Sequence, residues 1–296
     1  MTTTTTEGPR EGLAFVDGEI IDLADATVPL VDRGYLLGDG VFDTLRTSSG
    51  RIFQRDAHEA RMKDALKVLG FDADAMDGVR EALDALAKAG RDQISDELYL
   101  RVQVTTGDMA NLEGSRELGA RITGMAKPFK PYPMRYLNLG VHLVLSRQIK
   151  HSQDPLSRIK SLSFMPSVAA RRLALNQIAH DGIFSNEHGR LIEASTSNLF
   201  ARRGDTVYAP GPEEGAVPGI TRKLVLEWLE EADFEVKTQL QPSDFRRADE
   251  AWITNTVGGV VPVNRYNEKY IGDGQKGDVT RRLQHTLNVM IQEGAP

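Results

Sequence analysis

The chain has 296 residues, 40% of them hydrophobic, and a formal net charge of −6. It contains no cysteine, which excludes disulfides, thiolate metal sites and cysteine nucleophiles. Its mean hydropathy is −0.34, and no long apolar run or block of basic residues occurs, so we expect neither a membrane nor a nucleic-acid partner.

The chain opens with a polar segment that lacks the apolar core of a secretory signal. We interpret residues 1–12 as a disordered tail and expect a cytoplasmic protein. Asp17–Gly18 predicts the turn of a hairpin, and Asp56 is placed to cap a helix that stops at Gly70. The expected ranges are 14–21 for the hairpin, and 57–69 and 75–89 for two amphipathic helices.

Residues 97–106 alternate strictly between apolar and polar side chains, which predicts a half-buried strand. Tyr99 and Arg101 fall on its polar face. Such a face suits a carboxylate-binding wall because arginine offers a rigid, bidentate fork. An ordinary exposed face is the commoner outcome for a strand of this kind.

Three prolines between residues 128 and 133 predict an extended connection. We therefore place an interdomain linker at 127–136. It separates a small N-terminal domain, 13–126, from a larger C-terminal domain, 137–296.

The second domain is expected to alternate strands with helices. The predicted strands are 140–146, 182–185, 191–194, 198–201 and 206–208, with a further strand in the stretch 251–262 that runs into a turn at its two adjacent glycines. The predicted helices follow Lys160, begin near Gly219, and span about 279–291. On the helix after Lys160 the residues at helical spacing are Phe164, Met165, Val168, Ala169, Leu175, Ile178 and Ala179. The six histidines show no metal-ligand spacing, so no metal site is expected.

Lys160 and Glu193 fit the two poles of a pyridoxal phosphate site. An amine can join the cofactor's aldehyde covalently, and a carboxylate can face its pyridine nitrogen. The first turn of the helix at Gly219, Ile220 and Thr221 has unpaired amides that suit a phosphate. Each feature alone is common, because lysines often precede helices and most helix starts bind nothing.

Six segments in a fixed order make the chain similar to the class-IV, or fold-type IV, pyridoxal phosphate-dependent aminotransferases. This family includes branched-chain and D-amino acid aminotransferases, (R)-selective amine transaminases and aminodeoxychorismate lyase. The matching segments are 33–42, 58–61, 159–162, 193–200, 218–222 and 279–284. The resemblance implies an α/β fold of two domains, the smaller N-terminal, and a homodimer.

The resemblance also assigns roles to residues. It makes Lys160 the catalytic, cofactor-binding lysine and Glu193 the partner of the pyridine nitrogen. The other residues it assigns to the cofactor are Arg61, Ser197, Val217, Ile220, Thr221 and Thr256. Those it assigns to the substrate are Leu37, Phe42, Tyr99, Arg101 and Val257.

The predicted function is transfer of an amino group between an L-branched-chain or similar amino acid and a 2-oxo acid such as 2-oxoglutarate. Tyr99-x-Arg101 matches the branched-chain enzymes, but Met165 stands where many of them have tyrosine. D-amino acid or (R)-amine transamination is therefore an alternative. Asparagine at position 255 is similar to what aminodeoxychorismate lyase has there, so lyase activity is the third possible function. A protein that binds the cofactor without turnover is the fourth.

Overall fold

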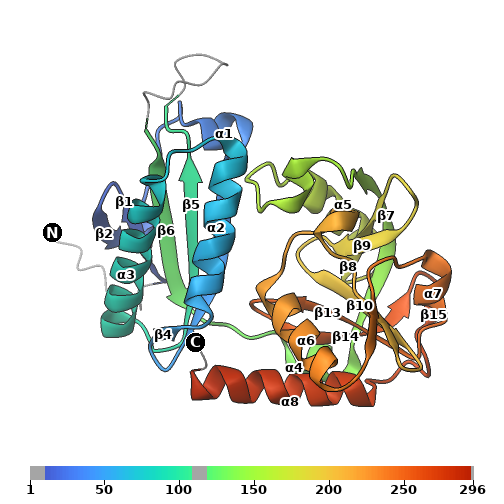
Figure 1. Cartoon of the computed structure of the whole chain (residues 1–296). Helices are drawn as coiled ribbons and strands as arrows, with labels where there is room; N and C mark the ends of the chain where they lie inside the picture. Colours follow the sequence, from blue (N-terminus) through green and yellow to red (C-terminus); the bar gives the residue numbers. More distant parts are fainter. Residues whose placement is uncertain (1–10, 109–118, 295–296) are drawn as a thin grey trace, which may run out of the picture. The chain divides into compact units, whose positions relative to one another are not determined.

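The structure, a computed structural model, describes residues 11–108 and 119–294. The chain divides between Lys130 and Pro131 into unit 1, which comes before this point, and unit 2, which extends from it to Glu293 (Figure 1). Within the stretch 127–136, β6 ends at Pro128 and α4 begins at Met134, so only the residues between them lie outside helices and strands.

The described part of unit 1 forms a six-stranded antiparallel sheet in the order β2-β1-β6-β5-β3-β4. Its strands are β1 Leu13–Val16, β2 Glu19–Asp22, β3 Gly40–Ser48, β4 Arg51–Ile52, β5 Leu98–Thr105 and β6 Arg121–Pro128. Its helices are η1 Leu23–Asp25, α1 Arg33–Leu37, α2 Arg55–Leu69 and α3 Ala75–Gln93.

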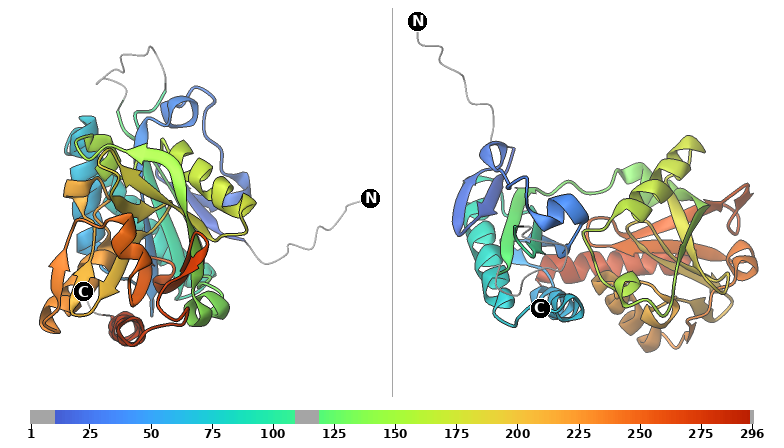
Figure 2. Two further views of the ribbon diagram at one scale, coloured as in Figure 1. Left: turned by 90° about the vertical axis from the view of Figure 1, so that its right-hand side faces the viewer. Right: turned by 90° about the horizontal axis from the view of Figure 1, so that it is seen from above.

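Helices α2 and α3 cover one face of this sheet (Figures 1 and 2). Leu98, Leu100, Val102 and Val104 are at most 1% exposed on that face. Tyr99 and Arg101 are half-buried on the other face. The alternation predicted for this strand is confirmed, because successive side chains of a strand point to opposite sides.

The hairpin and helices α2 and α3 of unit 1 were predicted, but the start of α2 was wrong. The cap of α2 is Gln54, with φ of 55° and no side-chain cap hydrogen bond. Asp56 lies inside the first turn, where its carboxylate still faces the positive end of the helix dipole. Gly70 ends the helix in the left-handed conformation, with φ of 78°, as predicted.

Unit 2 is built on a mixed sheet of nine described strands in the order β12-β11-β10-β13-β14-β7-β8-β9, with β15 beside β14. A further pairing of β9 with β10 connects distant strands of this order. The strands are β7 Val141–Lys150, β8 Asp181–Asn186, β9 Leu191–Ala194, β10 Asn198–Arg203, β11 Thr206–Tyr208, β12 Glu235–Lys237, β13 Glu250–Asn255, β14 Gly259–Tyr266 and β15 Lys269–Tyr270.

The helices of unit 2 include the predicted α6 and α8. Their bounds, with the other helical segments, are α4 Met134–Leu139, η3 Pro155–Arg158, α5 Met165–Asn176, η4 Pro212–Glu214, α6 Ile220–Glu231, α7 Pro242–Arg246 and α8 Asp278–Glu293. The core lies between sheet and helices and includes the fully buried Phe245, Ile253 and Tyr266. No helix in residues 11–108 and 119–294 is both long and apolar enough to cross a membrane.

The residues predicted at helical spacing after Lys160 do not mark the buried face of α5, and two of them, Ile178 and Ala179, lie beyond its end at Asn176. Met165 is 66% exposed and Leu175 58%, whereas the buried residues of this helix are Ala170 and Ala174. A Cβ on Gly182 of β8 would lie 2.7 Å from the Ala170 carbonyl oxygen. The helix therefore packs through small residues at close backbone approach, which a pattern of large apolar side chains cannot reveal.

Candidate active site

The carboxylate of Glu193 is the centre of the polar cluster in unit 2. Its side chain is 8% exposed on β9. Oε2 accepts a hydrogen bond from the backbone N–H of Val217 at 2.9 Å and a longer one from Asn198 Nδ2 at 3.5 Å. Oε1 accepts from Lys150 Nζ at 2.5 Å. A carboxylate has about four acceptor positions, so it retains capacity for a further donor.

The loop before α6 is attached to this acid through Asn198. Its Nδ2 also donates to the Val217 carbonyl oxygen at 2.8 Å. A Cβ on Gly219 would lie 1.9 Å from Asn198 Oδ1, so only glycine fits there. Gly219 is the N-cap of α6 and provides no side-chain cap. The amides of the first turn at Ile220 and Thr221 are therefore not capped by a side chain, and the Thr221 side chain is buried beside them.

Asn255 organises the turn between β13 and β14. Its Oδ1 accepts from the backbone N–H groups of Val257 at 3.0 Å and Gly258 at 2.6 Å. Its Nδ2 donates to Ser197 Oγ at 2.8 Å and to the Tyr132 hydroxyl at 3.3 Å. The turn containing Thr256 and Val257 is thereby fixed against the segment that joins β9 to β10.

Lys160 lies in unit 2 between η3 and α5 and is half-buried. The loop that leads to it is bonded at several points. Arg158 donates to the Ser152 carbonyl oxygen, and Ser152 donates to Glu187 through its backbone N–H at 2.9 Å and its hydroxyl at 2.5 Å. These bonds to Ser152 hold the pKa of Glu187 down to about 2.

In unit 1, the guanidinium of Arg101 stacks 3.8 Å from the ring centroid of Phe42. Its Nε donates to Gln103 Oε1 at 3.3 Å. Tyr99 lies two residues earlier on the same face. The register of β3 against β5, in which Phe42 pairs with Gln103, brings Phe42, Tyr99 and Arg101 into one region of this unit.

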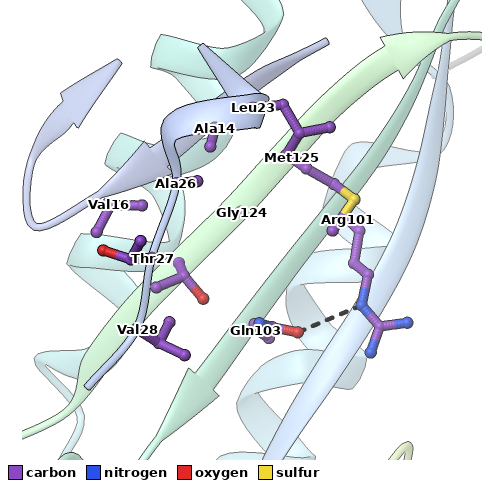
Figure 3. A pocket seen from close by; sticks show the side chains of 11 residues that line it. Ala14, Val16, Leu23, Ala26, Thr27, Val28, Arg101, Gln103, Gly124 and Met125 are labelled. Atoms are coloured by element: carbon purple, nitrogen blue, oxygen red, sulfur yellow. Dashed lines mark hydrogen bonds between the residues drawn. The ribbon is translucent and has the colours of Figure 1, made fainter. Parts of the chain in front are cut away.

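Arg101 is at the wall of a pocket of about 210 Å³ on the open face of the sheet (Figure 3). The other polar side chains that line it are Thr27, Gln103 and Thr123. The remaining lining is apolar or glycine and comes from Ala14, Val16, Leu23, Ala26, Val28, Gly124 and Met125. A short aliphatic group with an anionic end suits this lining.

Arg61, also in unit 1, is held by Asp43. Nε and Nη2 of the guanidinium donate to the two carboxylate oxygens at 3.0 and 2.6 Å. His58 Nδ1 lies 3.3 Å from Asp43 Oδ1. Burial alone would raise the pKa of Asp43, but Arg61 and His58 hold it well below its ordinary value.

Leu37, which the resemblance assigns to the substrate, ends α1 and is 43% exposed.

Several residues of these clusters were given no role from the sequence, among them Asn198, Tyr132 and Lys150. Asn198 lies in one of the six matching segments but was given no role, although its place five residues after Glu193 could have drawn attention to it. Tyr132 was assigned only to the linker. No spacing rule would have found Lys150, because it reaches Glu193 across β8.

The family model for amino-transferase class IV matches residues 40–266. The chain belongs to the class-IV aminotransferase family. It is 29% identical over 276 residues to aminodeoxychorismate lyase of Bacillus subtilis (strain 168), covering 92% of each chain. It is 29% identical over 286 residues to D-alanine aminotransferase of Staphylococcus haemolyticus, covering 94% of this chain and 97% of that one.

A solved branched-chain amino acid aminotransferase from T.th., complexed with N-(5'-phosphopyridoxyl)-L-glutamate, has the same fold. Its TM-score is 0.86 at 22% identity, with 98% of this chain and 97% of that chain covered. The predicted two-domain α/β fold of this class-IV enzyme is therefore confirmed. Its cofactor is pyridoxal phosphate.

The residues of unit 2 fit this cofactor. Glu193 offers a buried carboxylate with spare acceptor capacity, as a protonated pyridine nitrogen requires. The first turn of α6 offers amides and a hydroxyl for a phosphate at a glycine that permits close approach. In the described residues no cluster of three or more His, Asp or Glu could hold a metal ion.

Proposed function

We propose that this class-IV enzyme transfers the amino group of an L-branched-chain or similar aliphatic amino acid to a 2-oxo acid such as 2-oxoglutarate. The observation that supports this most is the pairing of Arg101 with a mainly apolar pocket. Among the described residues, Arg101 makes its hydrogen bond through Nε, so its two terminal nitrogens can receive a carboxylate. The apolar lining suits an aliphatic side chain.

In this proposal Lys160 binds the cofactor and transfers protons, and Glu193 binds the cofactor ring. Bound pyridoxal phosphate would supply an aldehyde that joins the substrate amine and a ring that withdraws electrons from the α-carbon. Lys160 would release the cofactor to the substrate and then carry a proton between the α-carbon and C4′ of the cofactor. Glu193 would accept a hydrogen bond from the ring nitrogen and hold its proton.

Other assignments remain proposals that the family resemblance supports. Ile220, Thr221 and Thr256, with Arg61, would bind the phosphate, and Val217 would lie under the ring. Ser197 would complete the cofactor site through its hydrogen bond with Asn255. Leu37, Phe42, Tyr99 and Val257 would contact the substrate.

D-Amino acid or (R)-amine transamination is the second candidate. The likeness to a D-alanine aminotransferase over 94% of this chain favours it. Met165 also favours it, since this position lacks the hydroxyl of many branched-chain enzymes and is 66% exposed.

The lyase candidate is weakened by the bonds of Asn255. The likeness to aminodeoxychorismate lyase supports this candidate. In the sequence, Asn255 was the residue that favoured it. That amide already donates to Ser197 and Tyr132 and accepts from Val257 and Gly258. Its bonding capacity is thus used to shape the turn, which gives it a structural reason to be asparagine.

We also propose a homodimer in the cytoplasm. A run of apolar side chains in unit 1 is exposed, and such surfaces commonly mark interfaces between proteins. The exposed fractions are 45% for Val28, 77% for Leu30, 49% for Val31, 66% for Tyr35, 44% for Leu36 and 43% for Leu37. Light scattering should give the mass of two chains, and Leu30→Asp should lower it. The same change at Val68, exposed on α2, should not.

The deciding experiment is a half-reaction without any 2-oxo acid. L-Leucine and D-alanine are added to separate samples of the cofactor-loaded enzyme, and the visible absorbance of the lysine-bound cofactor is followed. Loss of absorbance with L-leucine alone supports the proposal. Loss with D-alanine alone overturns it in favour of D-amino acid chemistry. Pyruvate release from aminodeoxychorismate without an acceptor would identify the lyase.

A further inference from the structure

Lys150 is hydrogen-bonded to Glu193, the acid proposed for the cofactor site. Its Nζ lies 2.5 Å from Glu193 Oε1, and its side chain is 18% exposed against 8% for Glu193. The amine also lies 5.9 Å from the ring centroid of Phe184. Removing two charged groups from water in this way costs free energy, which is offset only if the ion pair has good geometry and its remaining hydrogen-bonding positions are filled.

The sheet fixes this pairing. Lys150 is opposite Asn186 on β8, and Glu193 is opposite Phe184, two residues earlier on the same strand. Residues two apart on a strand share a face, so Lys150 and Glu193 extend over the same side of β8. An irregularity in the pairing of β7 with β8, between Leu145 and Ile149, sets which residue of β7 takes this position.

The contact occurs at one pole of the proposed cofactor site. Pyridoxal phosphate carries its aldehyde on the ring carbon opposite the ring nitrogen, so a lysine that binds the nitrogen's partner is at the wrong end of the ring to join the aldehyde. Lys150 is thus distinct in role from Lys160.

We propose that Lys150 is a positioning residue that acts through Glu193 and limits how firmly the ring nitrogen holds its proton. This inference rests on the proposed role of Glu193. The amine fixes Oε1, while the Val217 N–H and Asn198 fix Oε2, so the carboxylate cannot rotate freely. The positive charge of Lys150 offsets part of the negative potential that Glu193 presents to the ring nitrogen.

Other charged groups lie around Glu193 and make further contacts of their own. Arg222 on α6 is half-buried and interacts electrostatically with Glu193, but its guanidinium donates to the carbonyl oxygens of Pro210 at 3.0 Å and Ala209 at 2.9 Å. On β8, Asp181 is three residues before Phe184 and lies 3.6 Å from Arg171. On β10, Arg202 lies near Glu250, beyond the residue that pairs with Glu193. Of these cations, Lys150 is the one hydrogen-bonded to the Glu193 carboxylate, so its removal should act on Glu193 most directly.

The test uses enzyme loaded with pyridoxal phosphate that is isotopically labelled at the ring nitrogen. Nitrogen NMR against pH reports directly whether that nitrogen carries a proton. Removing a unit charge a few ångströms away should move the pH of proton loss upward by roughly one unit or more. We expect this in Lys150→Met, while Lys150→Arg, which keeps the charge, should titrate like the wild type.

The control for net charge is Lys269→Met, at an exposed position on β15, which should also titrate like the wild type. If Lys150→Met does not fold, Lys150→Gln carries the test, since it keeps a hydrogen-bond donor without the charge. A purely structural role would lower the midpoint of thermal unfolding and leave the titration unchanged, and that result would overturn the inference.

Failure of the cofactor assignment, on which the proposed function and the role of Glu193 both depend, would look different. Wild-type protein and every variant would then lack the visible absorbance of lysine-bound cofactor after pyridoxal phosphate is added. If wild-type protein and Lys150→Met both show this absorbance and their ring nitrogens titrate at the same pH, the role of Lys150 is refuted while the cofactor assignment stands.

Discussion

The side-chain amide of Asn198 donates to the carbonyl oxygen of Val217 at 2.8 Å, and this bond joins β10 to the loop before α6. The same nitrogen lies 3.5 Å from Glu193 Oε2. One asparagine therefore connects the acid proposed for the ring nitrogen with the helix start proposed for the phosphate. The distance between these two sites is held by side-chain hydrogen bonds as well as by the chain itself.

Gly219→Ala should weaken cofactor binding at least tenfold. The added Cβ would lie 1.9 Å from Asn198 Oδ1, so either the asparagine or the helix start must move. Titration of the protein with pyridoxal phosphate, followed by absorbance, measures the effect. Gly189→Ala is the control, because its Cβ meets no atom within 4 Å and its φ of 73° should cost stability alone. Equal affinities in all three proteins would contradict the prediction.

Lys160→Ala should abolish turnover and the visible absorbance of covalently bound cofactor. Its amine is proposed both to bind the aldehyde and to carry the proton, and alanine can do neither. Transamination and absorbance are measured on the same sample. Lys269→Met serves as the matched control and should keep both properties. Substantial residual turnover in Lys160→Ala would refute the assignment.

Arg101→Met should raise KM for the amino acid about 100-fold with a smaller change in kcat. A charge-assisted bond to a carboxylate is worth up to about 3 kcal/mol, and its loss affects binding of ground and transition states alike. Arg46→Met is a close control, since Arg46 also stacks 3.8 Å from an aromatic ring, that of Phe129, but is paired with Glu97 at 3.0 Å. An unchanged KM in Arg101→Met would place the carboxylate elsewhere.

Asp43→Asn should destabilise the protein by about 3–5 kcal/mol, because it leaves the buried guanidinium of Arg61 without its carboxylate. Urea unfolding measures the loss. Asp84→Asn is the control, since that carboxylate is 63% exposed in its pair with Arg55 and should matter little. If Asp43→Asn lowers the free energy of unfolding by less than about 1 kcal/mol, the buried Asp43–Arg61 pair does not stabilise the protein as inferred.

His180 should make the protein less stable in mild acid. Burial, with Arg171 as a second cause, lowers the pKa of His180 to about 4 from 6.5. Its Nε2 has no hydrogen-bond partner within the described ranges. Between pH 6.5 and about pH 4, the unfolded chain therefore binds a proton at His180 that the folded protein does not bind. Stability is therefore complete above pH 6.5 and falls as the pH drops toward 4, by up to about 3 kcal/mol.

The variant His180→Phe should remove this slope, and it keeps an aromatic ring beside Tyr136, whose centroid lies 4.8 Å away. Urea unfolding at several pH values, compared with the wild type, gives the difference. Burial raises the pKa of the adjacent Asp181, which contributes a slope of opposite sign. That contribution is present in both proteins and drops out of the comparison. Parallel curves for the two proteins would contradict the prediction.

Local pattern was sufficient for much of the fold. The alternation around Tyr99 and Arg101 predicted which face of β5 is buried, and Gly70 predicted the end of α2. These features depend on nearest neighbours along the chain. The cap of α2 was predicted wrongly, and the spacing pattern after Lys160 did not identify the buried residues of α5. Gln54 takes the cap position through its backbone conformation, and α5 packs on Gly182 through Ala170, a contact between distant segments.

The sequence by itself determined the family, the α/β fold and the cofactor, because six short segments in order carry them. Tertiary structure alone decided that Lys150 faces Glu193, that Asn198 excludes a side chain at Gly219, and that Asn255 uses its amide to shape a turn. The physical reason is that these contacts join residues on different strands and loops. Strand register and a local irregularity of pairing set their distances, and no spacing along the chain records either.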